Sequence, residues 1–274
     1  MSRKPGSTLL VHGALIAGAV ATLTPLVWMV SASFMPEGEA NSLVPHFLPS
    51  RVTLAHYITL FSRLDLGRHL MASLLVSGAA TLSSVLFNAM AGYAFGKLRF
   101  PGRERIFKGL LLMLSIPSQV AVLPLFLLLK SMGFVNTYWG VVIPSMSSIF
   151  GIFLVRQYVR SIPDDLLDAA RIDGAGELRI FWSIVLPVCR PVLATLAIFT
   201  FMGTWNDFMW PLVILTDASK YTLPVALANL SGEHVQDTEL MMAGSVLTIL
   251  PVLLLFLALQ RVYVEGIVAG GVKE

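Results

Sequence analysis

Six long apolar runs constrain the fold of this chain more than any other feature of its sequence. They cover residues 9–34, 70–95, 106–129, 139–155, 191–215 and 241–259. A helix needs about 20 residues, with a range of about 17–25, to cross the hydrocarbon core of a bilayer. Hydrophobic residues make up 56% of the chain, whereas about 45–50% is usual for a soluble domain. The sequence therefore predicts an all-α integral membrane protein with six transmembrane helices in one domain, residues 1–274.

Prolines interrupt several of these runs. Pro117 and Pro124 lie in the third, Pro144 interrupts the fourth, and Pro211 and Pro251 lie in the fifth and sixth. Proline is tolerated in a membrane helix where neighbouring helices satisfy the freed carbonyl groups. We therefore keep all six runs as predicted spans.

The first run has two features of a cleaved signal peptide. Arg3 and Lys4 precede it, and the small residues 31–33 follow it. A signal peptide, however, has an apolar core of about 7–15 residues, and this run is longer. The sequence favours an uncleaved first helix.

The placement of Lys and Arg orients the chain in the membrane. If the N-terminus is cytoplasmic, 14 of the 19 basic residues lie on the cytoplasmic side, as the positive-inside rule requires. These residues are Arg3, Lys4, Lys97, Arg99, Arg103, Arg105, Lys108, Arg156, Arg160, Arg171, Arg179, Arg190, Arg261 and Lys273. The net charge of +3 therefore reflects topology and does not indicate nucleic-acid binding. We expect a multi-pass protein of the bacterial cytoplasmic (inner) membrane with both termini inside.

Motifs that mark nucleotide sites, common hydrolase sites and metal sites are missing from the sequence. It contains no G-x-x-x-x-G-K-[ST] nucleotide motif, no H-E-x-x-H and no G-x-S-x-G. The single cysteine, Cys189, rules out an internal disulfide and a cysteine metal cluster, and we expect it to be a small residue near a helix end. The sequence predicts a chain without catalytic residues, metal or cofactor of its own.

One polar segment, residues 163–187, interrupts this apolar pattern on the predicted cytoplasmic side. Pro163 suits a first helical turn, and the acidic pair that follows, Asp164 and Asp165, complements the helix dipole. Leu166, Leu167 and Ala170 are expected to share one helix face, and Gly174 to end the helix in a left-handed conformation. The pattern alone predicts a short amphipathic helix that docks on a partner or packs on its own protein.

Ten residues of this segment occur at a spacing that resembles a known family. They are Asp168, Ala169, Ala170, Asp173, Gly174, Ala175, Phe181, Ile184, Leu186 and Pro187. The spacing is similar to E-A-A-x-x-D-G-A-x(5)-F-x-x-I-x-L-P, the cytoplasmic loop of type I ABC-importer permeases. Only Asp168 departs from the pattern, and it keeps the negative charge of the usual Glu. The resemblance implies that this loop carries a coupling helix, which sits in a cleft of the ATP-binding subunit.

Other stretches resemble the carbohydrate branch of that family, in which the maltose-type transporters have two permeases and this chain is similar to the smaller one. They are residues 43–61, 93–104, 205–215 and 260–274. The resemblance implies alternating access driven by ATP and Mg bound to two ATPase subunits, not to this chain. It also implies a homologous permease partner and an extracytoplasmic sugar-binding protein.

The solute path is expected where polar groups occur inside the predicted spans. Asp207 is the one carboxylate within a span, and a charge there costs roughly 2.5–3.5 kcal/mol on insertion scales, so it should face water or a partner. The candidate path residues are Asn88, Gln119, Trp205, Asn206, Asp207 and Trp210. The sequence favours the alternative in which Trp205 and Trp210 belong to an interfacial aromatic belt and Asp207 pairs with the partner permease. Asn88 and Gln119 are equally consistent with contacts between helices.

Two alternative functions remain open. A glycerol-phosphate or polyamine importer keeps the same class, although a phosphate cargo favours Arg or Lys at mid-depth, and the spans contain neither. A secondary transporter or channel needs further intramembrane charges for ion coupling, and only Asp207 qualifies. We find no inverted halves with broken helices in the sequence.

Overall fold

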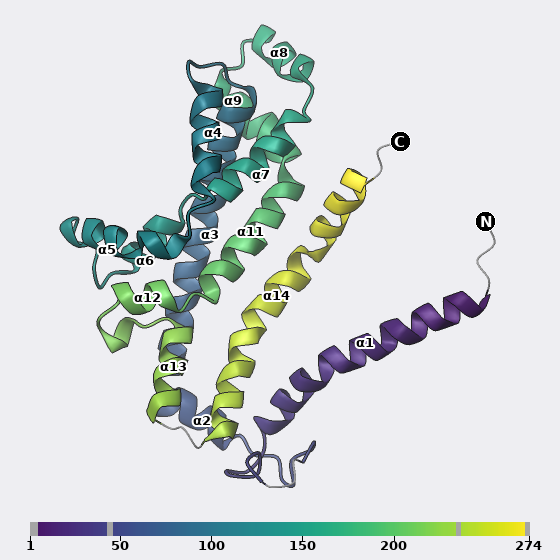
Figure 1. Cartoon of the computed structure of the whole chain (residues 1–274), viewed down its shortest axis with the longest axis vertical. Coiled ribbons are helices and arrows are strands. Elements are labelled where there is room, and N and C mark those ends of the chain that lie inside the picture. Colours follow the sequence, from purple (N-terminus) through teal and green to yellow (C-terminus); the bar gives the residue numbers. More distant parts are fainter. Residues whose placement is uncertain (1–4, 43–45, 234–236, 272–274) are drawn as a thin grey trace. The chain divides into compact units, whose positions relative to one another are not determined.

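The computed structural model describes residues 5–42, 46–233 and 237–271, and every regular element in these ranges is helical (Figure 1). The elements are α1 (Pro5–Ala32), α2 (Ala55–Ser62), α3 (Leu66–Lys97), α4 (Arg103–Met113), η1 (Ser118–Ala121), α5 (Val122–Ser131), α6 (Tyr138–Ser145), α7 (Ile149–Arg160), α8 (Asp164–Ile172), α9 (Glu177–Ile180), a π-helical turn η2 (Phe181–Val185), α10 (Leu186–Val188), α11 (Arg190–Trp205), α12 (Met209–Ile214), η3 (Ala218–Lys220), α13 (Leu223–Glu233) and α14 (Thr238–Gly271). The basic residues Arg3, Lys4 and Lys273 lie outside the described ranges.

The chain divides into two compact units. The first contains Met1–Gly67 and Ala226–Pro251, and the second contains Arg68–Val225 and Val252–Glu274. The segment that resembles a coupling loop and all six candidate path residues belong to the second unit.

Three of the described helices are long and apolar enough to cross a membrane by themselves: Val11–Ala32, Leu66–Lys97 and Thr238–Ala258. Three further candidates are pairs of helices with a bend between them, so the count reaches six only if each pair is one span. The pairs are Arg103–Met113 with Ser118–Ser131 (98°), Tyr138–Ser145 with Ile149–Arg160 (41°), and Glu177–Val188 with Arg190–Trp205 (79°). The third and fourth runs are therefore broken helices, whereas the bend of the third pair, at Cys189, lies before the fifth run. The fifth run is interrupted instead at residues 206–208, between α11 and α12. Of these breaks, the sequence predicted only the interruption of the fourth run near Pro144.

Each bend has a local cause. In the first pair, Pro117 is the extended residue that precedes η1. In the second pair, Pro144 ends α6, and the Ser148 hydroxyl accepts a hydrogen bond from the Gly151 N–H (2.9 Å) to start α7. In the third pair, Pro187 and Pro191 lie on either side of the bend, and neither has an N–H to continue the helical ladder.

Helices α3 and α7 pack at very close range because two glycines of α3 face two valines of α7. A Cβ added to Gly92 would lie 2.6 Å from Cγ1 of Val155, and one added to Gly96 would lie 3.0 Å from Cγ1 of Val159. The two glycines are four residues apart, the spacing that lets membrane helices approach backbone to side chain. This contact gives the second unit a rigid centre.

A buried arginine strengthens the same contact at the ends of these helices. The Arg156 side chain of α7 donates to the Phe95 carbonyl (3.1 Å) and to both oxygens of Glu104 (2.9 and 3.0 Å). Its guanidinium carbon also lies 3.9 Å from the centre of the Phe107 ring. Arg156 therefore joins α7 to both α3 and α4.

Candidate functional site

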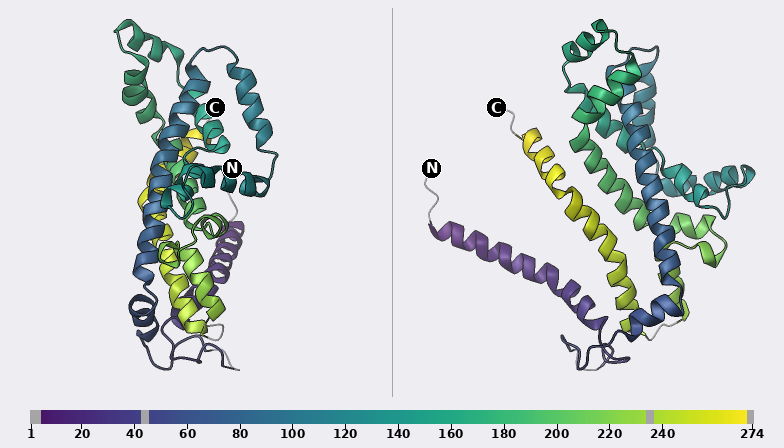
Figure 2. Two further views of the ribbon diagram at one scale, coloured as in Figure 1. Left: turned by 90° about the vertical axis from the view of Figure 1, so that its left-hand side faces the viewer. Right: turned by 180° about the vertical axis from the view of Figure 1, so that it is seen from behind.

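The segment 163–187 folds as α8, α9, η2 and the start of α10. Figure 1 shows α8 at one end of the second unit, beyond the ends of α3 and α4, and the two views of Figure 2 agree. Pro163 precedes the helix in an extended conformation, not in its first turn as expected, so Asp164 is the first helical residue. A helix in this position is held only by its two ends and by one face.

The N-terminus of α8 is bound to the C-terminus of α3. The Lys97 ammonium group donates to the Asp164 carboxylate (2.6 Å) and to the Ile162 carbonyl (2.5 Å). The hydrogen bond from Lys97, with its positive charge, lowers the pKa of the Asp164 carboxyl group below its usual range. The sequence reasoning did not connect Lys97 with α8, since the two residues come from different loops.

The C-terminus of α8 is closed by Gly174 in the left-handed conformation that the sequence predicted, with φ +81°. The Gly174 N–H donates to the Arg171 carbonyl (3.0 Å), and the Ala175 N–H donates to the Ala170 carbonyl (2.9 Å). These two bonds form a Schellman motif, which satisfies the last carbonyl groups of a helix. Asp173, the residue before the glycine, is exposed.

The two faces of α8 differ in chemistry. Leu167 is 1% exposed and, with Ala170, packs on a core cluster formed by α3, α7, α9, η2 and α11. Leu166 is 46% exposed, so the expectation that it shares the buried face with Leu167 was wrong. Successive residues of an α-helix are about 100° apart, and the face that carries Leu167 turns Leu166 outward. Ala169 and Ile172 are also exposed.

A chain of ionic hydrogen bonds fixes the turn between α8 and α9. The Arg171 guanidinium donates to Asp168 (2.6 Å) and to Glu177 (2.8 Å), and Glu177 also accepts a hydrogen bond from the Tyr93 hydroxyl of α3. Asp168, the residue that stands for the family's Glu, is therefore committed within its own chain. The sequence analysis missed Arg171, Glu177 and Tyr93, although the three-residue spacing of Asp168 and Arg171 was visible.

The remaining residues of the pattern lead back toward the membrane helices. Phe181 is buried, and Ala175, Ile184 and Leu186 pack against the same core cluster. Pro187 lies just before the bend at Cys189, which is buried between α10 and α11 as a small residue at a helix end. These residues anchor the segment to the core cluster, whereas its other large apolar side chains are exposed.

Four large apolar side chains of the segment are exposed. Their exposed fractions are 46% for Leu166, 86% for Ile172, 69% for Leu178 and 53% for Trp182. Large apolar side chains exposed among charged residues are a feature of interaction sites. The residues belong to one charged segment, so lipid tails are a poor environment for them.

Among the candidate path residues, Asn88 is fully buried and its hydrogen-bonding groups are all used. Its amide nitrogen donates to the carbonyl (2.7 Å) and hydroxyl (2.8 Å) of Ser84, while its oxygen accepts from the Ser148 N–H (3.0 Å) and the Ser147 hydroxyl (3.3 Å). An Asn side chain has two donor hydrogens and two acceptor lone pairs. In this arrangement Asn88 joins α3 to the start of α7, so it makes a contact between helices, the alternative to lining the solute path.

The other candidates lie at breaks between helices. Trp205 is 0% exposed and stacks on Phe201, with ring centres 5.6 Å apart, so it does not line a path here. Asp207 accepts a hydrogen bond from the Trp210 N–H (3.3 Å), and the Trp210 indole donates to the Gly140 carbonyl (3.0 Å). Asn206 caps the end of α11, and the exposed Gln119 lies in η1.

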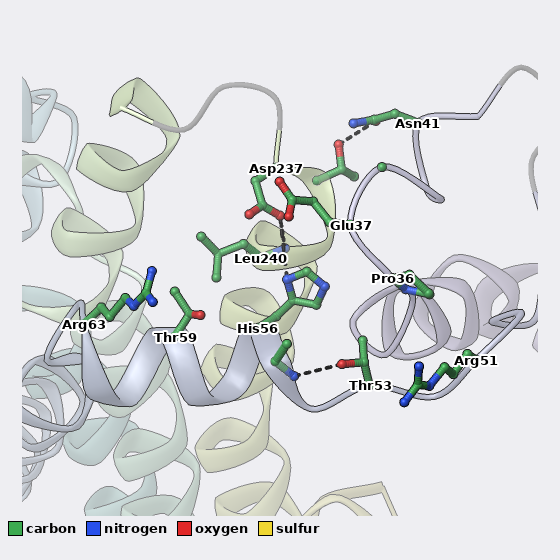
Figure 3. A pocket seen from close by; sticks show the side chains of 13 residues that line it. Pro36, Glu37, Asn41, Arg51, Thr53, His56, Thr59, Arg63, Asp237 and Leu240 are labelled. Atoms are coloured by element: carbon green, nitrogen blue, oxygen red, sulfur yellow. Dashed lines mark hydrogen bonds and ion pairs between the residues drawn. The ribbon is translucent and has the colours of Figure 1, made fainter.

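A polar hollow of 1350 Å³ lies in the first unit (Figure 3). Its walls come from the loop after α1, from α2 and from the start of α14. His56 of α2 is close to the Met35 carbonyl through Nε2 (2.9 Å) and to Asp237 through Nδ1 (3.8 Å). Thr238 donates to Asn41 (2.7 Å), so these contacts fasten the loop to α14. His234, a neighbour in sequence, lies outside the described residues.

Comparison with known proteins assigns this geometry to a family. Residues 84–268 match the family described as binding-protein-dependent transport system inner membrane component. The chain is 38% identical over 262 residues to the arabinooligosaccharides transport system permease protein AraQ of Halalkalibacterium halodurans, covering 93% of this chain and 92% of that protein. It is 31% identical over 277 residues to the sn-glycerol-3-phosphate transport system permease protein UgpE of Yersinia pestis bv. Antiqua, covering 98% of each.

The fold has a counterpart among solved structures. A chain of a bacterial ABC transporter involved in the import of the acidic polysaccharide alginate superimposes with a TM-score of 0.81 at 22% identity, covering 95% of this chain and 98% of that chain. At this identity the likeness concerns the fold alone. With the family match, it identifies the architecture as that of a type I ABC-importer permease. The chain belongs to the inner membrane components of binding-protein-dependent transport systems.

Proposed function

We propose that this chain is one permease subunit of an ATP-driven importer for carbohydrates, and that α8 is its coupling helix. It forms half of the translocation path, next to a homologous permease, and two ATP-binding cassette subunits dock on the cytoplasmic side. ATP and Mg bind to those subunits. An extracytoplasmic binding protein delivers the solute.

The exposed apolar side chains of segment 163–187 carry this proposal. Leu167 anchors one face of α8 in the core, whereas Leu166 and Ile172 point away from it. One side of the segment therefore packs on its own chain, and the apolar side chains of the other side remain exposed. A partner that covers Ile172, which is 86% exposed, gains apolar burial at about 25 cal/mol per Å².

The charge distribution supports a cytoplasmic position for this surface. Fourteen of the 19 basic residues fall on one predicted side, the side that includes α8, and such an excess marks the cytoplasm. We infer an inner-membrane location with both termini in the cytoplasm.

The geometry also supports a mechanism for transmitting motion. Lys97 binds the N-terminus of α8 to α3, Tyr93 binds the start of α9 to α3, and α3 packs on α7 through its glycines. A displacement of α8 by the ATPase subunits would therefore move α3 and α7 together. Rocking of the membrane helices then exposes the central site alternately to either side.

The docking surface can be tested by substituting its most exposed residue. Ile172→Asp should abolish co-purification of the ATP-binding cassette subunit with the tagged chain, because a charge replaces the apolar contact. Val52→Asp is the matched control, since Val52 is 69% exposed and lies outside the segment. Equal recovery of the ATPase subunit with both variants would overturn the assignment of α8, as would ATP hydrolysis by the purified chain alone.

The cargo can be tested by uptake competition in cells that contain the whole importer. A carbohydrate importer should take up a labelled oligosaccharide, and excess sn-glycerol-3-phosphate should not compete. The similarity to a glycerol-phosphate permease makes the reverse result the alternative outcome. The absence of Lys and Arg at mid-depth in the predicted spans favours a neutral cargo.

A further inference from the structure

A second hollow, of 950 Å³, lies beside α8. Its walls are the end of α3, the loop that follows it, the end of α7 and the inner face of α8. The lining residues on α8 are Asp164, Leu167, Asp168 and Arg171, which share one face at i, i+3, i+4 and i+7.

The hollow is strongly basic. Six cationic side chains line it, against three carboxylates. The cationic residues are Lys97, Arg99, Arg103, Arg156, Arg160 and Arg171, and the carboxylates are Asp164, Asp168 and Glu177. Each carboxylate already accepts a hydrogen bond from Lys97 or Arg171. These contacts use only Lys97 and Arg171, and four further cationic side chains line the hollow.

Two of the cations are not committed to the fold. Arg103 and Arg156 are held by carbonyl groups and by Glu104. Arg99 and Arg160, by contrast, are exposed and have no ion-pair or hydrogen-bond partner among the residues that the structure describes. Arginine presents a planar fork of donors that fits phosphate oxygens in pairs.

We propose that this hollow binds a phosphate group, with Arg99 and Arg160 as its principal ligands. The phosphate belongs either to the headgroup of an acidic phospholipid or to a soluble phosphate ester. Basic pockets at the cytoplasmic ends of membrane helices bind acidic headgroups, and this hollow has that position if the orientation proposed above holds. Since the bound phosphate would lie between α8 and the ends of α3 and α7, it would stiffen the connection through which α8 moves them.

The experiment uses the purified full-length chain in nanodiscs and needs neither ATPase nor transported solute, so it is independent of the proposed function. The melting temperature is measured in phosphatidylcholine alone, in phosphatidylcholine with added phosphatidylglycerol, and in phosphatidylcholine with inorganic phosphate in the buffer. The test variant is Arg99→Gln with Arg160→Gln. The matched control is Arg179→Gln with Arg190→Gln, which removes two exposed cations of the same predicted side that do not line the hollow.

Phosphatidylglycerol or phosphate should raise the melting temperature of the native chain and of the control. The test variant should need at least about tenfold more of the same probe to reach the same rise in melting temperature, given the strength of hydrogen bonds between charged groups. A response to phosphatidylglycerol alone identifies a headgroup, and a response to phosphate in neutral lipid identifies a soluble ester. No shift with either probe, or equal shifts in the test and control variants, would overturn the proposal.

Discussion

Gly174 offers the sharpest test of how α8 works. Its φ of +81° is a left-handed conformation, and a Cβ added there meets nothing within 4 Å. The cost of Gly174→Ala therefore comes from the backbone alone, roughly 1–2 kcal/mol for an L-residue in this conformation. This free energy weakens the closed turn relative to open forms by a factor of about 5–30. Gly174→Val should cost more, since a β-branched residue is a genuine outlier there.

We expect this loss to affect coupling and not membrane insertion. The turn holds two hydrogen bonds at the end of α8, whereas insertion depends on the long apolar helices. Both variants should therefore reach the membrane at normal levels, with lower uptake per molecule and less ATPase subunit recovered with the tagged chain. Membrane abundance and uptake are measured in the same cells.

A matched control lies two residues away. Gly176 has φ −72°, a value open to any residue, and a Cβ added there also meets nothing within 4 Å. Gly176→Ala should therefore leave uptake unchanged. Equal loss in Gly174→Ala and Gly176→Ala would refute the backbone argument. Lower abundance of Gly174→Val with normal uptake per molecule would show that the turn only packs on its own protein.

Four further outcomes are expected. Gly92→Ala should destabilise the chain by about 1–3 kcal/mol, measured as a lower melting temperature, because the new methyl group would lie 2.6 Å from Val155. Gly78→Ala in the same helix is the control: its methyl group meets nothing within 4 Å, so the melting temperature should not change. Asn88→Ala should lower the melting temperature by leaving buried partners unsatisfied, at about 1–3 kcal/mol each; an altered KM for uptake with unchanged melting would instead place it in the path. Asp207→Asn should keep the hydrogen bond from the Trp210 N–H and normal uptake, whereas Asp207→Ala should lose about 1 kcal/mol of stability; lost uptake in both, with ATPase stimulation intact, would assign the carboxylate to the solute. The contact of Asp164 with Lys97 contributes above the ordinary pKa of the carboxyl group, 3.8, and is lost only as the pH falls through its lowered value. The protection of the α8 amides, which is their hydrogen exchange relative to the intrinsic rate at each pH, should therefore stay unchanged from neutral pH to about pH 5; a loss of protection already at pH 6 would contradict this.

Features of the sequence that act locally were predictable. The left-handed Gly174 follows from a glycine after a short amphipathic helix, and the apolar runs gave the number of candidate spans. The family pattern located α8 within a few residues. Each of these depends on neighbours along the chain.

Features that depend on distant neighbours were not predictable in the same way. Apolar run length cannot detect a 98° bend, because the residues on both sides of Pro117 are equally apolar. Asn88 was a candidate path residue from the sequence alone, because the sequence does not show that the N–H of Ser148, sixty residues later, donates a hydrogen bond to its side-chain oxygen. Tyr93 and Lys97 gained their roles only when α8 folded against the end of α3.

The close packing of α3 on α7 also sets an order for biosynthesis. The groove over Gly92 and Gly96 is complete once α3 is made, but the valines that fill it are translated only after α4, α5 and α6. Until then the face of α3 that carries Gly92 and Gly96 lacks the valines that pack on it, and another helix with small residues could approach it. If translation stops before α7, we therefore expect a fragment that can pair with the wrong helix. Once α7 is made, Val155 packs on Gly92 and the buried Arg156 binds α3 and α4, so the site for such pairing is filled.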